Sequence, residues 1–277
     1  MTRKPLGQVQ TAYGPKDIYP MDDIFINYTF SNPENWETLR TIANIMINAY
    51  RAENHSTQLE PITGTIKVET QYKHFKNPAA TPPSQDLRLE EIPSLSHHYI
   101  ELQSEPRPQI PISARSINYF GLGISKVKGD YANQLWLIAG DIPEIFNGQH
   151  FARYTLKDEK TNAQHPHKSG ILYVNLKKLS QEDTTAGKLA AYLLGQQLEG
   201  SQDLATVTEQ IHNSFIKFQQ DKEVPDMISL QQRWLEQGEA RGEARGEAKA
   251  TSTMLEKLAA LVKDGIIPNE VLQQLSE

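Results

Sequence analysis

The chain has 277 residues, 38% of them hydrophobic, which is enough for one large domain or two modest ones. It has no cysteine, which excludes disulfide scaffolds, iron–sulfur clusters, thiol catalysis and zinc sites built on cysteine. Its formal net charge of −6 is not typical of a protein that coats nucleic acid, so any nucleic-acid site must depend on a local patch. No apolar run approaches the roughly 20 residues that span a bilayer, and no apolar leader follows Met1. We therefore expect a cytoplasmic protein with no membrane partner.

Residues 1–22 are rich in Gly, Pro and polar residues and are expected to form an extended lead-in. A helix is predicted from Asn32, a good N-cap, to about Arg51, because apolar residues recur there at steps of three and four. Alternating or short apolar runs predict strands at 66–72, 86–90, 99–103, 134–139, 151–156 and 170–176. Further helices are predicted at about 113–126, 181–198 and 202–221. Since strands and helices mix without regular βα alternation, we expect one mixed α/β domain over residues 23–222.

The C-terminal part is expected to be a separate helical tail. Residues 238–250, within a segment at 223–250, repeat Gly-Glu-Ala-Arg and give a helix no apolar face to bury. This repeat is either a solvated charged linker or a helix whose small residues allow close approach of a second copy. Residues 251–277 are predicted to form a helical hairpin that serves docking or homo-oligomer formation.

Three polar residues stand out chemically. Glu101 and Gln103 are two apart in a predicted strand, so they share one face while Ile100 and Leu102 point to the core. If the two neighbouring strands pair, Asp86 can approach Glu101. Two carboxylates at the edge of a sheet can bind a hard divalent cation such as Mg²⁺. The alternative is a pair of solvent-facing acids on an amphipathic hairpin.

The run 100–106 (Ile-Glu-Leu-Gln-Ser-Glu-Pro), with Asp86 fifteen positions before Glu101, resembles the core of PD-(D/E)XK-type nucleases. More narrowly, it is similar to the recombination-promoting nuclease/transposase family. That family continues with a helix of the pattern Arg-x-x-x-Tyr, which Arg115 and Tyr119 match.

Looser parts of the resemblance extend over residues 18–250. Asp22-x-x-Phe25 is similar to the opening motif of the family, although Ile26 stands where the family usually has Lys. Residues 173–178 resemble a later strand of the family, and Gly-Glu-Ala-Arg repeats recur near its C-termini.

The resemblance implies a restriction-endonuclease-like mixed β-sheet flanked by helices, and a DNA endonuclease that depends on Mg²⁺ or Mn²⁺. It implies that Asp86 and Glu101 are catalytic metal ligands, and that Gln103 occupies the catalytic position that the wider superfamily gives to Lys. An amide cannot act as a base and carries no charge, and a charge near 4 Å is worth at most about 4 kcal/mol at an intermediate dielectric. Arg115, if its helix packs over the sheet, could supply that charge to a DNA phosphate. Tyr119 is implied as a second DNA contact.

Asp22 and Glu69 are further candidate acids, of which Asp22 is equally suited to a helix entry. His165 and His167 are expected to be loop histidines, since no third metal ligand is evident near them. The rival hypothesis is a catalytically weak or inactive DNA- or protein-binding module that keeps the nuclease fold and oligomerises through its tail.

Overall fold

A computed structural model of the chain describes most of its first 236 residues. The described ranges are 3–70, 87–92, 94, 96–103, 111–126, 132–161, 163, 165, 169–196, 202–233 and 236, with side chains omitted at 122–126. The chain divides into two compact units, Met1–Met227 and Ile228–Glu277. All elements below belong to the first unit. The predicted tail repeat at 238–250 and the helices beyond it lie outside the described residues.

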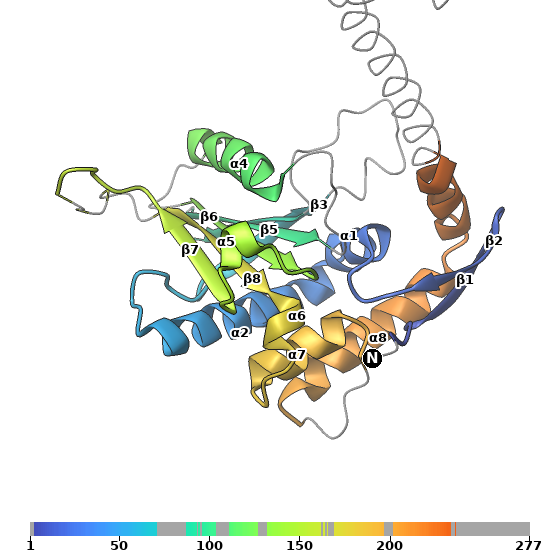
Figure 1. The fold of residues 1–277 in the computed structure, drawn as a ribbon. Coiled ribbons are helices and arrows are strands. Elements are labelled where there is room, and N and C mark those ends of the chain that lie inside the picture. The colour runs from blue at the N-terminus through green and yellow to red at the C-terminus, as the bar shows by residue number, and fades with distance from the viewer. Residues whose placement is uncertain are drawn as a thin grey trace, which may run out of the picture. The chain divides into compact units, whose positions relative to one another are not determined.

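The strands form a two-stranded hairpin and a six-stranded mixed sheet with the order β3-β4-β5-β6-β8-β7 (Figure 1). Strands β3, β4 and β5 are antiparallel, β5, β6 and β8 are parallel, and β7 is antiparallel to β8. The hairpin strands are β1 (Gly7–Thr11) and β2 (Gly14–Ile18). The strands of the larger sheet are β3 (Thr65–Thr70), β4 (Leu87–Ile92), β5 (Ser96–Gln103), β6 (Ala132–Ile138), β7 (Phe151–Thr155) and β8 (Gly170–Asn175).

Helices flank this sheet on both faces. The α-helices are α1 (Asp23–Ser31), α2 (Trp36–Asn54), α4 (Ile112–Lys126), α5 (Pro143–Phe146), α6 (Leu176–Leu179), α7 (Thr185–Leu193) and α8 (Ala205–Gln220). Short 3-10 helices η1 (Pro33–Asn35) and η2 (Gln202–Leu204) precede α2 and α8. In the described part of the chain, no helix combines the length and the apolar character needed to cross a membrane. The expected mixed α/β architecture is confirmed.

All six predicted strands are present, within a few residues of their expected bounds. Within the lead-in expected at 1–22, residues 7–18 form a paired hairpin, because Gly14 adopts a positive φ of 103° at its turn and Val9 and Ile18 are buried. The helix expected from Asn32 begins as η1, where the Asn32 side chain accepts a hydrogen bond from the Glu34 N–H, and continues as α2.

Two helical elements differ from the prediction. Helix α1 has no predicted counterpart, because six of its nine residues are buried and a helix that is buried nearly all round shows no polar stripe. The helix predicted at 181–198 is shorter, and the Asn175 side chain caps an additional helix, α6, by accepting from the Lys178 N–H.

The register divides the sheet into two faces, because directly paired residues point to the same side. One face, which we call the α4 face, carries the side chains of Tyr99, Glu101, Gln103, Gln134, Trp136, Ile138, Ile171 and Tyr173. The opposite face, which we call the α2 face, carries Leu87, Ile100, Leu135 and Leu172. Figure 1 shows α4 on one side of the sheet and α2 on the other.

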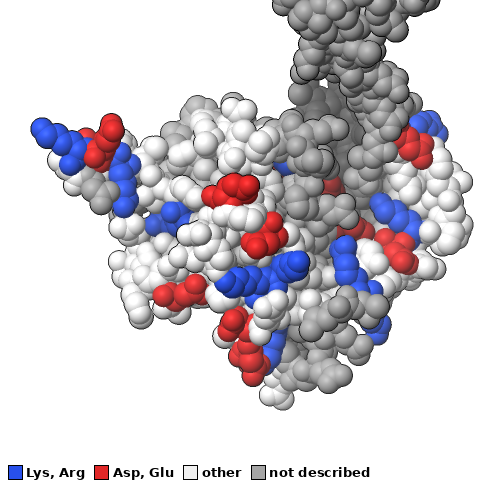
Figure 2. All heavy atoms as spheres, in the orientation of Figure 1, with Lys and Arg blue, Asp and Glu red and all other residues white. Residues whose placement is uncertain are grey.

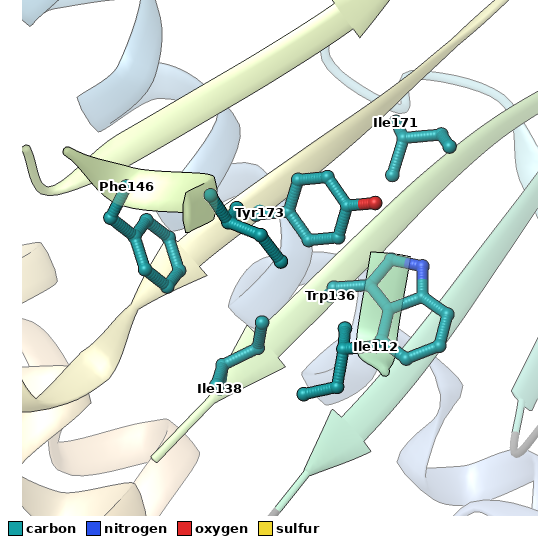
Figure 3. Close-up of a cluster of buried hydrophobic side chains, with 7 residues drawn as sticks. Ile112, Trp136, Ile138, Phe146, Ile171 and Tyr173 are labelled. Atoms are coloured by element: carbon teal, nitrogen blue, oxygen red, sulfur yellow. The ribbon is translucent and has the colours of Figure 1, made fainter. Parts of the chain in front are cut away.

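A buried apolar cluster fixes α4 and α5 on the α4 face (Figure 3). Its members are Ile112, Trp136, Ile138, Ile145, Phe146, Ile171 and Tyr173. The Ser116 hydroxyl of α4 also forms a buried hydrogen bond with the Tyr173 hydroxyl of β8. Packing and this polar contact together hold α4 in one place over β6 and β8.

We expect Ile138→Ala to lower the free energy of unfolding by about 2–5 kcal/mol, because Ile138 is fully buried in this cluster and truncation leaves a cavity. The matched control is Ile117→Ala on α4, whose side chain is 66% exposed and whose loss should cost less than about 0.5 kcal/mol. Urea denaturation measures both. Equal losses in the two variants would contradict the assignment of this cluster as the core between α4 and the sheet.

Candidate functional site

Glu101 and Gln103 lie side by side along β5 on the α4 face. Strand β5 is an interior strand. Its Glu101 and Gln103 are the strand partners of Trp136 and Ile138 on β6. Glu101 is only 2% exposed and Gln103 is also buried. Strand β5 is not the edge strand that was expected, because β4 and β6 flank it on both sides. The alternative of a solvent-facing acid is also wrong for Glu101, which is buried. The sequence alone could not place β6 beside β5.

The predicted pairing of the strands at 86–90 and 99–103 is confirmed for the described residues, as β4 and β5. Leu87 of β4 is the antiparallel partner of Ile100 of β5, and both point to the α2 face as buried core residues. Asp86, the proposed partner of Glu101, directly precedes Leu87 in the chain and lies outside the described residues.

Helix α4 brings Arg115 to Gln103. Arg115 Nη1 donates a hydrogen bond to Gln103 Oε1 over 2.8 Å. Because a guanidinium has donors and no acceptor, this contact assigns the oxygen of the Gln103 amide to the side that faces Arg115. The structure thus places a permanent positive charge beside the Gln103 amide.

Arg115 rests on two aromatic rings of the same site. Its guanidinium carbon lies 5.6 Å from the ring centroid of Trp136 and 5.8 Å from that of Tyr119. The Tyr119 ring is stacked on Trp136, with centroids 6.0 Å apart and an interplanar angle of 22°. Residues four apart in a helix share a face, so Arg115 and Tyr119 point together toward the sheet. Cation–π contacts of this kind stabilise a guanidinium by about 0.5–2 kcal/mol.

The two further candidate acids are not part of this arrangement. Asp22 is at the N-cap position of α1, where its Oδ2 accepts a hydrogen bond from the Tyr19 N–H over 2.9 Å. Burial raises the pKa of Asp22. Glu69 is on the edge strand β3, its side chain is 72% exposed, and it forms an ion pair with Arg88 at 2.8 Å. Strand β4 separates Glu69 from Glu101 in the sheet.

A polar network on the α4 face was not predicted. Arg88 Nη2 lies 3.1 Å from His97 Nε2, and His97 Nδ1 lies 3.2 Å from the Tyr99 hydroxyl. Arg88 can only donate a hydrogen bond, and the Glu90 carboxylate lies 3.4 Å from the same nitrogen of His97. Burial and the nearby charge of Arg88 lower the pKa of His97, which agrees with a neutral imidazole. The alternation of polar residues in both strands was the available signal for this network.

The most strongly shifted carboxylate belongs to the α2 face. Contact with His98, at 3.5 Å, and hydrogen bonds from the N–H groups of Gly64 and Thr63 lower the pKa of Glu91 to about 2. Glu91 therefore fastens the segment before β3 to strand β4. Its role is structural, and it lies on the face opposite Glu101.

Among the described residues, no group of three or more histidine or acidic side chains is arranged to hold a metal ion. On the α4 face, the carboxylate of Glu101 is buried and lies on the same strand as Gln103, which bonds to Arg115. Of the predicted loop histidines, His165 donates its backbone N–H to Leu156, and His167 lies outside the described residues, as do residues 104–106 of the family-like run.

Neither a family model, nor a curated protein, nor a solved structure matches this chain. The function is therefore argued from the residues and their geometry.

We expect Glu91→Gln to lower the free energy of unfolding at pH 7 by about 2–3 kcal/mol, because the variant loses an ionised acceptor of several hydrogen bonds. The pKa of Glu91 is depressed in the folded state, so its contribution is present above about pH 4.5. It disappears as the pH falls from 4.5 toward 2. Denaturant titrations at several pH values measure this difference.

The control for this titration is Glu69→Gln, which removes an exposed ion pair and should cost less than about 1 kcal/mol. A wild-type advantage over Glu91→Gln that stays constant between pH 7 and pH 3 would contradict the account of Glu91.

Proposed function

We propose that the chain is a DNA endonuclease that depends on Mg²⁺ or Mn²⁺, with a restriction-endonuclease-like fold of the recombination-promoting nuclease/transposase type. The observation that carries the proposal is the convergence of Glu101, Gln103, Arg115 and Tyr119 on the α4 face. These residues come from two separate elements of the family-like motif. If Glu101 and Gln103 were unrelated polar residues of a hairpin, no contact between Gln103 and Arg115, twelve residues later, would be expected.

Asp86 is proposed as the second carboxylate of the site. Leu87 and Ile100 are Cα partners, and Asp86 and Glu101 are their immediate neighbours in the chain. Consecutive Cα atoms are 3.8 Å apart and paired strands about 5 Å, so covalent geometry limits the distance between the Cα atoms of Asp86 and Glu101 to about 13 Å. The proposal requires the β4–β5 ladder to extend by this one further pair.

The donor set suits a hard cation. Mg²⁺ is commonly held by one or two carboxylates and completed by water and substrate phosphate oxygens, so Asp86 and Glu101 would be its protein ligands. When bound, such an ion polarises the phosphodiester and lowers the pKa of a water molecule. The small number of protein ligands is consistent with a site that shares its cation with DNA.

Gln103 and Arg115 are proposed to provide together the functions that the lysine of the superfamily provides alone. Gln103 can orient a water through the donor half of its amide, while Arg115 carries the positive charge that stabilises a phosphate under attack. The rings of Trp136 and Tyr119 hold the guanidinium over the sheet, next to Gln103. Arg115 and Tyr119 are the proposed contacts to DNA.

Outside the candidate site, the charges on the described surface provide little general attraction for DNA. On the face drawn in Figure 2, the visible lysine, arginine, aspartate and glutamate side chains of the described residues are interspersed, and they form no continuous basic surface. Binding is therefore expected to depend on a few local phosphate contacts and to weaken less with salt than the binding of a protein with a broad basic surface. A binding module without catalytic activity is the rival function, and the same experiment separates the two.

We expect the wild-type protein to nick or cleave supercoiled plasmid in the presence of Mg²⁺ or Mn²⁺, and chelator to abolish this activity. Glu101→Gln and Asp86→Asn should each reduce the cleavage rate at least about a hundredfold, because each removes one charged ligand of the cation while keeping the shape of the side chain. Agarose gel assays of nicked and linear product measure the rate.

Glu69→Gln is the matched control, since it removes a carboxylate from the same face but outside the site, and it should cleave at the wild-type rate. Cleavage that survives both Asp86→Asn and Glu101→Gln would exclude the proposed site. DNA binding by the wild type without cleavage under any divalent metal would favour the rival binding module.

A further inference from the structure

A buried glutamine is hydrogen-bonded to one of the aromatic rings that support Arg115. Gln134 is on β6, 1% exposed, and points to the α4 face between its strand partners Tyr99 and Ile171. Its Oε1 accepts a hydrogen bond from Trp136 Nε1 over 3.0 Å. The side chain is therefore part of the sheet face that carries Glu101, although the sequence suggested only a buried apolar strand.

The orientation of the Gln134 amide follows from hydrogen-bond chemistry. An indole nitrogen only donates, so the atom that faces Trp136 must be the amide oxygen. The amide nitrogen, Nε2, is buried and has no hydrogen-bond partner. A buried donor without a partner destabilises a fold, so the free amide nitrogen is a cost of having glutamine at this position. What the glutamine contributes is thus the hydrogen bond that its oxygen accepts from the indole N–H.

That bond sets the plane of a ring on which the site depends. The Trp136 indole is stacked with Tyr119 and lies under the guanidinium of Arg115, which in turn bonds to Gln103. A rotation of the indole would move the surface on which the guanidinium rests. A misplacement of about 1 Å at a charged catalytic group can reduce a rate by up to about a hundredfold.

We propose that Gln134 is a positioning residue: it fixes the Trp136 indole and, through that ring, the direction in which Arg115 presents its charge. The catalytic part of this inference rests on the proposed nuclease function, but the positioning of the indole and the guanidinium does not.

The test is Gln134→Met, which removes the amide that bonds to the indole but keeps the length of the side chain. This change exchanges one unpartnered donor, Gln134 Nε2, for another, Trp136 Nε1, so the melting temperature should change little. The cleavage rate constant kcat should fall roughly tenfold with KM nearly unchanged, since the lost interaction acts on the transition state. A merely structural role would lower the melting temperature instead.

Nuclear magnetic resonance reads the geometry independently of activity. The chain has three tryptophans, so the indole N–H resonance of Trp136 can be assigned by its loss in Trp136→Phe. In Gln134→Met this resonance and the side-chain Nε–H resonance of Arg115 should both shift. Gln134→Glu, which keeps an oxygen toward the indole, should restore both resonances toward their wild-type positions.

Asn133→Leu is the matched control. Asn133 is the preceding residue of β6, is buried, points to the α2 face and also has an unpartnered polar atom, Oδ1. This variant should leave the Trp136 indole resonance and kcat unchanged. On an Arg115→Ala background, Gln134→Met should cause no further loss of kcat, because the two residues act through one group.

An Arg115 resonance that does not move in Gln134→Met would overturn the inference whether or not the protein cleaves DNA. Equal resonance shifts in Asn133→Leu, or additive losses of kcat with Arg115→Ala, would overturn it as well. If the wild type cleaves no DNA while the resonances behave as described, the nuclease proposal fails and the positioning of Arg115 by Gln134 stands.

Discussion

The hydrogen bond from Arg115 to Gln103 joins helix α4 to the interior strand β5, and the candidate site exists only because that helix is fixed on the sheet. Helix α4 is held on the sheet by the apolar cluster around Trp136 and by the hydrogen bond between Ser116 and Tyr173. With α4 held this way, its inner side delivers a guanidinium to the sheet while its outer side remains in solvent. The packing of α4 is thus the constraint from which the chemistry follows.

The local patterns of the sequence predicted the elements better than their arrangement. All six strands of the large sheet were predictable, because alternation and short apolar runs are local signals. The interior position of β5 was not, since its parallel neighbour β6 follows it through the α4 connection and this pairing is non-local. The prediction therefore placed Glu101 at the edge of the sheet, whereas in the structure it is buried on an interior strand.

The candidate site was predictable where the family-like motif supplied residues, and not elsewhere. Asp86 stays a prediction, while the contact of Arg115 with Gln103 follows the expectation that its helix packs over the sheet. The supporting residues Gln134 and Trp136 could not be recognised, because a polar residue within a short apolar strand carries no sign of what it will bond. The network of Arg88 and His97 escaped notice for a similar reason, since its members come from two strands and only the register brings them together.

The central claim is that the Gln103 amide and the Arg115 guanidinium together provide the function of a single lysine. Moving the positive charge from position 115 to position 103 tests this claim most directly. Plasmid cleavage is measured for Arg115→Ala, for Gln103→Lys and for the double variant, with Arg51→Ala as a control arginine distant from the α4 face. The account predicts a loss of up to about a thousandfold in Arg115→Ala and a recovery of at least about tenfold when Gln103→Lys is added. Full activity in Arg115→Ala, or a double variant no better than Arg115→Ala, would contradict it.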